Sequence, residues 1–347
     1  AGPTQGPPPA ARPAPPALRP RQSRGSRVVA PKLAHDSITA RVATSAVPCA
    51  AMRTASASVR KIPCSMVSMP ARIAASTDRG LLAAMPGYVD GVLETKLVSV
   101  FPGNHTLGIP SHQALIALFD AERGIPLAIL DSREITSLRT GAATAVATKY
   151  LAREDASVAT ICGCGVQGRT QLAAVAAVRA LTRVYAVDRQ QENAARFARE
   201  MSNELGIEVI ASTDLVTAAR GSDICVTCTP SRQAILGAGD VSIGAFVAGV
   251  GADNPDKQEL DPALLARSAV VVDILDQAVA SGDLHHAIAA GVMTRDDVRA
   301  ELGEVVAGKK TGRRHDDEIV IFDSTGTALQ DVAAAAAVYE KAILRES

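Results

Sequence analysis

Three glycines, at positions 163, 165 and 168, give the spacing G-x-G-x-x-G within the stretch TICGCGVQGRT. They follow the apolar run VATICG and precede a helical pattern, and an acid, Asp188, stands twenty residues after Gly168. The first glycine allows a tight turn, the second lets the backbone approach a diphosphate, and the third lets the helix lie close to the strand. The pattern predicts a dinucleotide site with its phosphates at the positive end of the helix.

Asp188 and its neighbour bear on which dinucleotide binds. A carboxylate here accepts hydrogen bonds from the adenosine ribose hydroxyls and repels a 2′-phosphate, which favours NAD. Arg189 is a residue that can pair with that phosphate, so NADP stays open.

The cysteines near this turn suggest a second chemistry, a zinc site made from Cys162, Cys164, Cys225 and Cys228. Structural zinc sites usually take each pair of ligands from a C-x2–4-C loop. Here one pair is C-x-C inside the phosphate turn, and the other lies in DICVTC, which is typical of a buried strand. We therefore expect four small buried side chains and no metal.

Strands and helices that alternate along the chain would position these residues. A helix is expected over 137–152, helices over 168–181 and 190–204, and helix starts at Asp261-Pro262 and at Thr294 with Asp297. Short apolar runs lie at 157–162, 183–187, 208–211, 223–228, 245–250, 269–273 and 318–324. This order predicts an α/β fold with a doubly wound parallel sheet of the Rossmann type. Residues 93–131 predict a mainly antiparallel unit, and a helix over 326–343 closes the chain.

The composition limits the classes of function. Acidic and basic residues balance at 36 each, so no overall field attracts nucleic acid or an anionic membrane. No apolar run approaches the length of a membrane span, and six cysteines make no disulfide scaffold. We expect a cytoplasmic protein that acts on a small molecule.

Residues 1–61 differ from the rest, with ten Lys or Arg and one acid, Asp36. Such a segment buries too little apolar surface to order itself. We expect residues 1–65 to be a disordered or aberrant segment: a transit-type leader, a disordered tail, or mistranslated sequence upstream of the true domain.

The chain resembles the ornithine cyclodeaminase/mu-crystallin family, which includes archaeal-type alanine dehydrogenases and ketimine reductases. The resemblance covers about residues 68–345 and rests on blocks in order, including MPARI, AAMPGY, TKLVSVFPGN, ITSLRTGAATAVATKYLA, GCGVQGRTQL, GADNPDKQEL and IFDSTGTALQDVA. It implies an α+β domain for substrate binding and dimerisation, formed by residues 66–140 with 325–347. Residues 141–324 would form the dinucleotide domain, and the protein would be a homodimer.

The same resemblance implies a set of site residues. Arg72, Lys96 and Arg139 are similar to the basic residues that hold the substrate carboxylate, and Asp253 matches the acid that handles the substrate amine. Lys96 and Asp253 are therefore the candidate catalytic residues. The positions that match cofactor contacts, besides the three glycines and Asp188 with Arg189, are Ser111, Arg139, Val166, Gln167, Thr229, Val250, Gly251, Lys257 and Ser324. His112 in PSH reads as structural.

This set of residues implies hydride transfer. The hydride would move between nicotinamide and the α-carbon of a small L-amino acid or its imine, cyclic imines included. Cyclodeaminases that take ornithine carry a glutamate where this chain has Ala83. This difference favours an alanine dehydrogenase-like or ketimine reductase-like enzyme. Two alternatives stay open. One is an ornithine cyclodeaminase that recycles its NAD, and the other is a non-catalytic, NADP-dependent binder of a small ligand.

Overall fold

The computed structural model describes residues 73–89 and 91–346. The predicted segment 1–65 and Arg72 lie outside these ranges. The first part of the described chain is a five-stranded antiparallel sheet in the order β1-β2-β3-β4-β5. Its strands are β1 (Ile73–Thr77), β2 (Gly80–Val89), β3 (Val92–Val100), β4 (His112–Asp120) and β5 (Pro126–Asp131), with a 3-10 helix η3 (Pro102–Leu107) between β3 and β4. The antiparallel unit expected over 93–131 is confirmed, and it extends upstream by two strands.

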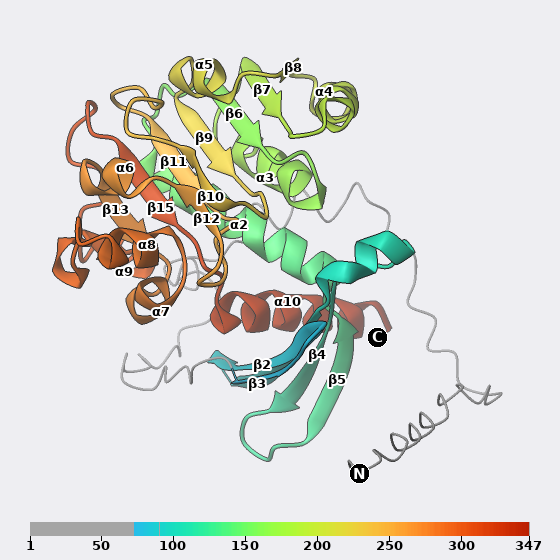
Figure 1. Ribbon diagram of the computed structural model, residues 1–347. Coiled ribbons are helices and arrows are strands. Elements are labelled where there is room, and N and C mark those ends of the chain that lie inside the picture. Colours follow the sequence, from blue (N-terminus) through green and yellow to red (C-terminus); the bar gives the residue numbers. More distant parts are fainter. Residues whose placement is uncertain (1–72, 90, 347) are drawn as a thin grey trace, which may run out of the picture. The chain divides into compact units, whose positions relative to one another are not determined.

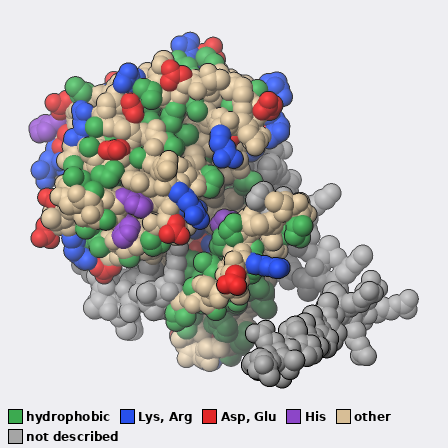
Figure 2. All heavy atoms as spheres, viewed as in Figure 1, with side chains coloured by type: hydrophobic (Ala, Val, Ile, Leu, Met, Phe, Trp, Pro, Cys, Tyr) green, Lys and Arg blue, Asp and Glu red, His purple; other side chains and the backbone are tan. Residues whose placement is uncertain are grey.

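The two faces of this sheet differ because side chains alternate along each strand. One face buries Met85, Ile116 and Leu118 against the C-terminal helix α10 (Ala328–Glu346), which crosses it (Figure 1). The opposite face leaves Leu82, Leu93, Leu115 and Ile129 exposed. Figure 2 shows hydrophobic side chains gathered over this sheet.

An eight-stranded sheet, in which every paired strand is parallel, forms the second part. Its spatial order is β14 (Ala300–Glu301), β13 (Ala269–Val272), β15 (Val320–Asp323), β11 (Phe246–Gly249), β9 (Ile224–Thr227), β6 (Val158–Cys162), β7 (Arg183–Val187) and β8 (Glu208–Ser212). The chain runs outward from β6 to β8 and then returns to β9 on the other side of β6. This is the doubly wound order predicted from the sequence, with its switch point between β6 and β9. A separate parallel pair joins β10 (Arg232–Leu236) and β12 (Gln258–Leu260).

The helices lie between these strands in the chain. They are α2 (Arg133–Leu151), α3 (Val166–Ala176), α4 (Gln191–Leu205), α5 (Leu215–Arg220), α6 (Pro262–Ala266), α7 (Leu275–Ala280), α8 (Asp283–Ala289), α9 (Leu302–Val306) and the 3-10 turn η4 (Arg295–Asp297). Both predicted helix starts are present: Asp261 accepts a hydrogen bond from the Ala263 amide, and Thr294 forms a capping box with Asp297.

Two predicted helices differ clearly from the observed ones. The helix expected over 168–181 ends earlier, at Ala176, and begins earlier, at Val166, because Gly165 is its N-cap and Gly168 stands inside its first turn. The helix expected over 137–152 begins four residues earlier, at Arg133, and runs without a break past the predicted domain boundary at residue 140.

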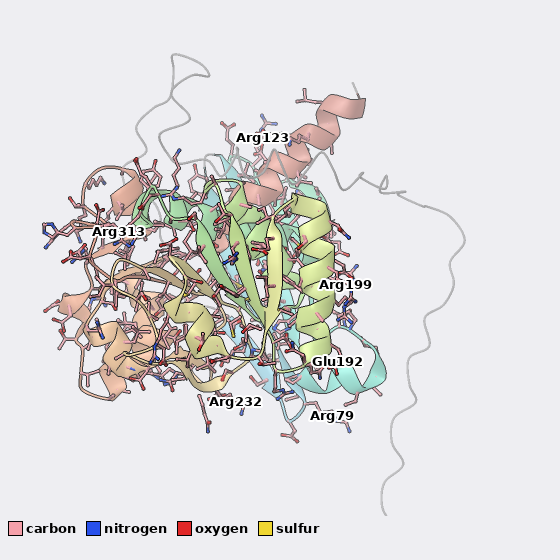
Figure 3. All side chains as sticks on the ribbon, turned by 90° about the horizontal axis from the view of Figure 1, so that it is seen from above. Arg79, Arg123, Glu192, Arg199, Arg232 and Arg313 are labelled. Carbon is pink, nitrogen blue, oxygen red and sulfur yellow. The ribbon has the colours of Figure 1, made fainter. Side chains whose placement is uncertain are left out.

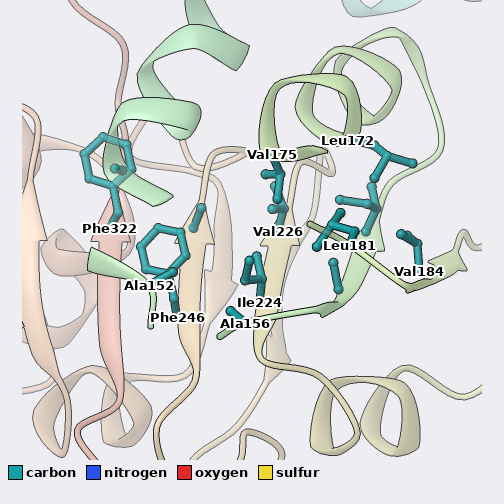
Figure 4. Packing of buried hydrophobic residues seen from close by; sticks show 14 of the residues in the cluster. Ala152, Ala156, Leu172, Val175, Leu181, Val184, Ile224, Val226, Phe246 and Phe322 are labelled. Atoms are coloured by element: carbon teal, nitrogen blue, oxygen red, sulfur yellow. The ribbon is translucent and has the colours of Figure 1, made fainter. Parts of the chain in front are cut away.

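The strands of the parallel sheet bury both of their faces, which explains their continuous apolar runs. Phe246 and Phe322 fill one side together with Val175 and Leu172 from α3 (Figure 4). In α4, Phe197 is fully buried, while Glu192 and Arg199 point away from the sheet (Figure 3). Within 73–89 and 91–346, no helix is long and apolar enough to cross a membrane.

Candidate active site

The three glycines of the turn between β6 and α3 meet three different surroundings. Gly163 has a φ of +102°, and a Cβ there would lie 2.8 Å from the Cys228 carbonyl oxygen. A Cβ on Gly168 would overlap the Gly163 carbonyl oxygen, so α3 approaches the end of β6 only because this side chain is absent. Apart from its two chain neighbours, no atom of the described chain lies within 4 Å of such a Cβ on Gly165, which caps the start of α3 with no side chain. Gly163 therefore forms the tight turn and Gly168 permits close packing, while the approach of a diphosphate at Gly165 stays a prediction.

Asp188 follows β7 and reaches the same turn. Its Oδ2 accepts a hydrogen bond from the Cys164 amide at 2.9 Å, and its Oδ1 accepts one from the Gln190 amide at 2.9 Å. These amides fix the carboxylate beside the start of α3, next to the exposed Arg189. Val166, also at the start of α3, is 68% exposed, and the Oε1 of Gln167 is buried with no hydrogen-bond partner in the described chain.

The loops after β9 and β11 are joined by a carboxylate that sequence reasoning missed. Glu259 on β12 is fully buried and accepts hydrogen bonds from the Thr229 amide (2.6 Å) and the Gly251 amide (2.7 Å). The hydroxyls of Thr227 and Thr229 donate to it as well. Burial raises its pKa, although these hydrogen bonds oppose the shift. Glu259 lies in the short strand QEL, and nothing in the neighbouring sequence marks this acid as buried.

A second buried acid, Asp283, holds the backbone of Glu259 in place. Asp283, at the start of α8, accepts hydrogen bonds from the Glu259 and Leu260 amides at 2.8 and 2.9 Å. Burial raises its pKa to about 7, and the pKa of the neighbouring Asp323 is raised for the same reason. The amides of Asp283 and Leu284 donate to Asp323, the last residue of β15, at the strand end before Ser324.

The two described residues predicted to hold a carboxylate, Lys96 on β3 and Arg139 on α2, come together on a third group. Lys96 Nζ lies 3.2 Å from Asp331 Oδ1, and Arg139 Nε lies 2.9 Å from the same oxygen. Asp331 is fully buried, and Lys96 is 3% exposed. Arg139 also donates from Nη1 to Gln330 Oε1 at 2.8 Å. Asp331 was not predicted, because it lies far along the chain on α10.

The charges of this cluster determine its chemistry. Burial and the neighbouring Arg139 lower the pKa of Lys96 to about 8, while the Asp331 carboxylate opposes that shift. Two cations against one carboxylate leave one positive charge uncompensated. A guanidinium and an ammonium can together hold an added carboxylate.

Asp253, the acid predicted to handle the amine, lies in the loop after β11. Its Oδ1 is 2.9 Å from Lys257 Nζ and accepts a hydrogen bond from Asn254 Nδ2 at 3.0 Å. His286 Nε2 contacts the Lys257 carbonyl oxygen at 2.8 Å and so holds this loop.

His112, the first residue of β4, lies within the electrostatic influence of both this loop and β3. Partial withdrawal of its ring from water lowers its pKa, and the charges of Asp253, Lys257 and Lys96 all act on it. The described groups predicted to bind the amine and the carboxylate therefore lie around one region.

Ser111, Val250 and Ser324 lie in the segments before β4, after β11 and after β15. Ser324 is 3% exposed and donates its amide to the Gly249 carbonyl oxygen at 2.8 Å. A Cβ on Gly326, two residues further, would lie 2.8 Å from Arg139 Nη1, so Arg139 lies against the loop between β15 and α10.

The four cysteines near the turn behave as small packed side chains. Cys162, Cys164 and Cys225 are buried, and Cys164 Sγ donates to the Val187 carbonyl oxygen. Burial raises the pKa of Cys164 and of Cys225 to about 12, whereas Cys228 is only partly buried. Among the residues that the structure describes, no three His, Cys, Asp or Glu side chains are grouped closely enough to hold a metal ion.

Known proteins resemble this chain over most of its length. An alanine dehydrogenase from Archaeoglobus fulgidus is 43% identical over 275 residues, which cover 79% of this chain and 84% of the relative. Among solved structures, an archaeal alanine dehydrogenase dimer with bound NAD superposes with a TM-score of 0.80 at 38% identity, covering 89% of this chain and 92% of the other. The Thermococcus litoralis Δ1-pyrroline-2-carboxylate reductase in complex with NADH and L-proline has a TM-score of 0.77 at 37% identity, covering 81% of this chain and 88% of the other.

The family model for ornithine cyclodeaminase and mu-crystallin matches residues 38–346. The match includes both sheets, the glycine turn and the Lys96–Arg139–Asp331 cluster. The chain therefore belongs to the ornithine cyclodeaminase/mu-crystallin family.

Proposed function

We propose that the protein is an NAD-dependent oxidoreductase that moves a hydride between nicotinamide C4 and the α-carbon of a small L-amino acid or its imine, cyclic imines included. One observation carries the proposal: a complete dinucleotide turn and a buried pair of cations suited to a carboxylate occur in the same chain. The relatives support it, since they are named alanine dehydrogenase and Δ1-pyrroline-2-carboxylate reductase.

The open space at Gly165 and the amides at the start of α3 would hold the diphosphate of the dinucleotide, and Asp188 would hold the ribose. When bound, NAD supplies the hydride acceptor, and NADH the donor. The carboxylate of Asp188 disfavours a 2′-phosphate, so we expect NAD to bind more tightly than NADP, with Arg189 as the residue that would permit some binding of NADP.

On the substrate side, Lys96 and Arg139 would grip the carboxylate, with Arg72 as a third candidate. Two contacts to a planar group fix the direction of the α-carbon, and this positioning is a large part of what a hydride transfer requires. Asp253 would take the proton that leaves the amine as the α-carbon loses its hydride, and would return it in the reverse direction. The ion pair with Lys257 keeps Asp253 in place.

The assembly belongs to the same proposal. We propose that residues 66–140 with 325–347 form the substrate and dimerisation domain, and that residues 141–324 form the dinucleotide domain. The outer face of the antiparallel sheet supports a homodimer, because Leu82, Leu93, Leu115 and Ile129 are exposed on it. A solved relative is a dimer with bound NAD. Free cysteines fit a reducing compartment, and we propose the cytoplasm.

The test is a panel of reactions with NADH and with NADPH: pyruvate plus ammonia, and cyclic imines such as Δ1-pyrroline-2-carboxylate. We expect oxidation of NADH in at least one of them. Incubation with L-ornithine and catalytic NAD is the opposing arm, because stoichiometric ammonia and proline without net NADH would make the protein a cyclodeaminase. Tight nucleotide binding with no turnover anywhere would favour a non-catalytic binder.

Two lysine substitutions distinguish loss of the proposed carboxylate contact from a nonspecific effect of removing a lysine. Lys96→Ala is expected to lower kcat/KM by roughly 10- to 150-fold, the equivalent of a lost hydrogen bond between charged groups. Lys309→Ala is the control, since Lys309 is exposed and outside the cluster. Equal kcat/KM in the two variants would remove Lys96 from the carboxylate site.

A further inference from the structure

Glu94 is a buried acid next to the proposed carboxylate site, and the mechanism above does not use it. It stands two residues before Lys96 on β3, so both side chains lie on the sheet face that α10 covers. Its cross-strand neighbours are Gly87 on β2 and Leu118 on β4. A Cβ on Gly87 would lie 3.2 Å from the Cβ of Ala328, so α10 closes tightly over this position. Glu94 is 3% exposed.

The carboxyl group of Glu94 has no hydrogen-bond partner on either oxygen within the described chain. Removing an ionised carboxylate from water without a hydrogen-bond partner is unfavourable, so the neutral acid is favoured. Burial, and then the Asp331 charge, raise its pKa to about 8, against the opposing influence of Lys96 and Arg139. Within residues 73–89 and 91–346, the charges that act on Glu94 come from its own strand (Lys96), from α10 (Asp331) and from α2 (Arg139).

Charge balance connects Glu94 with a ligand. With Glu94 neutral, the cluster of Lys96, Arg139 and Asp331 carries one net positive charge, which a single carboxylate neutralises. With Glu94 ionised, the cluster is already neutral, and an arriving carboxylate would add a negative charge in a site shielded from water. Glu94 is therefore placed to make carboxylate affinity depend on one proton.

We propose that Glu94 is a positioning residue that must be protonated for the substrate carboxylate to bind tightly, so that at alkaline pH binding draws one proton from solvent onto Glu94. The inference rests on the proposed carboxylate site. It goes beyond that site because it assigns Glu94 a role: its protonation state sets the net charge around the two cations, and it does not touch the reacting atoms.

Lys96 is the competing explanation, because its pKa is also lowered to about 8 and loss of its proton would weaken binding too. Glu94→Gln separates the two, since glutamine mimics the protonated acid permanently. If Glu94 loses its proton first, the variant keeps its affinity until Lys96 titrates, and the fall in affinity moves to higher pH. If Lys96 loses its proton first, the variant and the wild type lose affinity at the same pH.

The binding experiment titrates pyruvate into the full-length protein saturated with NAD⁺, a pair between which no hydride can be transferred because both partners are oxidised. Above pH 8, we expect the wild-type dissociation constant to rise by about tenfold per pH unit, the limit for one linked proton. Calorimetry in buffers of different ionisation enthalpy should show uptake of about one proton in the wild type and markedly less in Glu94→Gln. Glu122→Gln, in the exposed turn between β4 and β5, is the matched control and should behave as wild type.

Infrared spectroscopy can test the protonation of Glu94 without any ligand. The infrared difference between wild type and Glu94→Gln at neutral pH should contain the C=O band of a protonated carboxylic acid, and Glu94→Asp should restore such a band. Absence of the band, or the same pH profile in wild type and Glu94→Gln, would overturn the role of Glu94 alone. Absence of pyruvate binding at every pH would overturn the carboxylate site, and this inference with it.

Discussion

Alanine at Gly165 and alanine at Gly168 should damage the protein in different ways. Gly165→Ala is expected to weaken NADH binding and leave the stability of the nucleotide-free protein unchanged, because no atom lies within 4 Å of the added methyl group and φ is −82°, a value alanine adopts freely. Gly168→Ala is expected to lower stability itself, because its methyl group would overlap the Gly163 carbonyl oxygen and also lie 3.4 Å from Ile161.

The magnitudes follow from these surroundings. In Gly165→Ala the methyl group occupies the space from which a diphosphate oxygen would reach the amides at the start of α3. The loss of one hydrogen bond to a charged oxygen is worth about 1.5–3 kcal/mol, or roughly 10- to 150-fold in the dissociation constant. In Gly168→Ala the clash is with backbone, so α3 must move away from β6, and overpacking of this kind costs about 1–3 kcal/mol.

The assay pairs a titration of NADH fluorescence with thermal unfolding in the absence of nucleotide. Gly303→Ala is the matched control, since Gly303 lies in helix α9 with nothing near its added methyl group. Wild-type affinity for NADH in Gly165→Ala would refute the reasoning, because the space beside Gly165 would then not be the diphosphate site. A normal melting temperature in Gly168→Ala would refute the packing argument.

Three further predictions concern buried or site carboxylates. Asp331→Ala strands Lys96 and Arg139 without a counterion and should cost about 3–5 kcal/mol of unfolding free energy in a urea titration; a loss below about 1 kcal/mol would contradict the ion pairs. Asp188→Ser should shift the ratio of NADPH to NADH affinity toward NADPH by at least about tenfold, and an unchanged ratio would count against the ribose role. Asp283 has a raised pKa when folded, so its contribution to stability is complete below pH 3.8 and is lost as pH rises through about 7. Asp283→Asn should therefore lose less stability as pH rises from about 4 to about 7, by up to about 1.4 kcal/mol per pH unit, and parallel melting curves over this range would disprove this.

The parts of the fold that were predictable from sequence depend on neighbours in the chain. The strand runs, the switch to alternating helices and the glycine turn are set within a few residues of each position. Gly163, Gly165 and Gly168 could be given separate tasks because the strand, the turn and the helix follow one another directly. Helix ends were less accurate: α3 begins at Val166 because a glycine with free space can serve as N-cap, and its residue type does not reveal that.

The carboxylates that support the site could not be found in this way. Asp331 meets Lys96 across 235 residues and Arg139 across 192, and Glu259 reaches back 30 residues to Thr229. Nothing in the neighbouring sequence distinguishes these acids from solvated ones. Only the folded structure shows that these acids are removed from water and gain fixed hydrogen-bond or ion-pair partners.

Because these acids are buried, they influence the affinity of the site for a carboxylate, an effect that the number of charges in the sequence does not reveal. A cation pair in water would attract a substrate carboxylate only weakly, since solvent screens it. Under α10, Lys96 and Arg139 are shielded from water, but two bare cations there would repel each other and destabilise the fold. Asp331 removes one of the two charges, so the fold tolerates the pair and one positive charge remains for a ligand. Glu94 decides whether that positive charge persists, because loss of its single proton creates a negative charge that cancels it. The affinity of this site for a carboxylate is therefore determined by the four buried groups together, and the cations alone do not explain it.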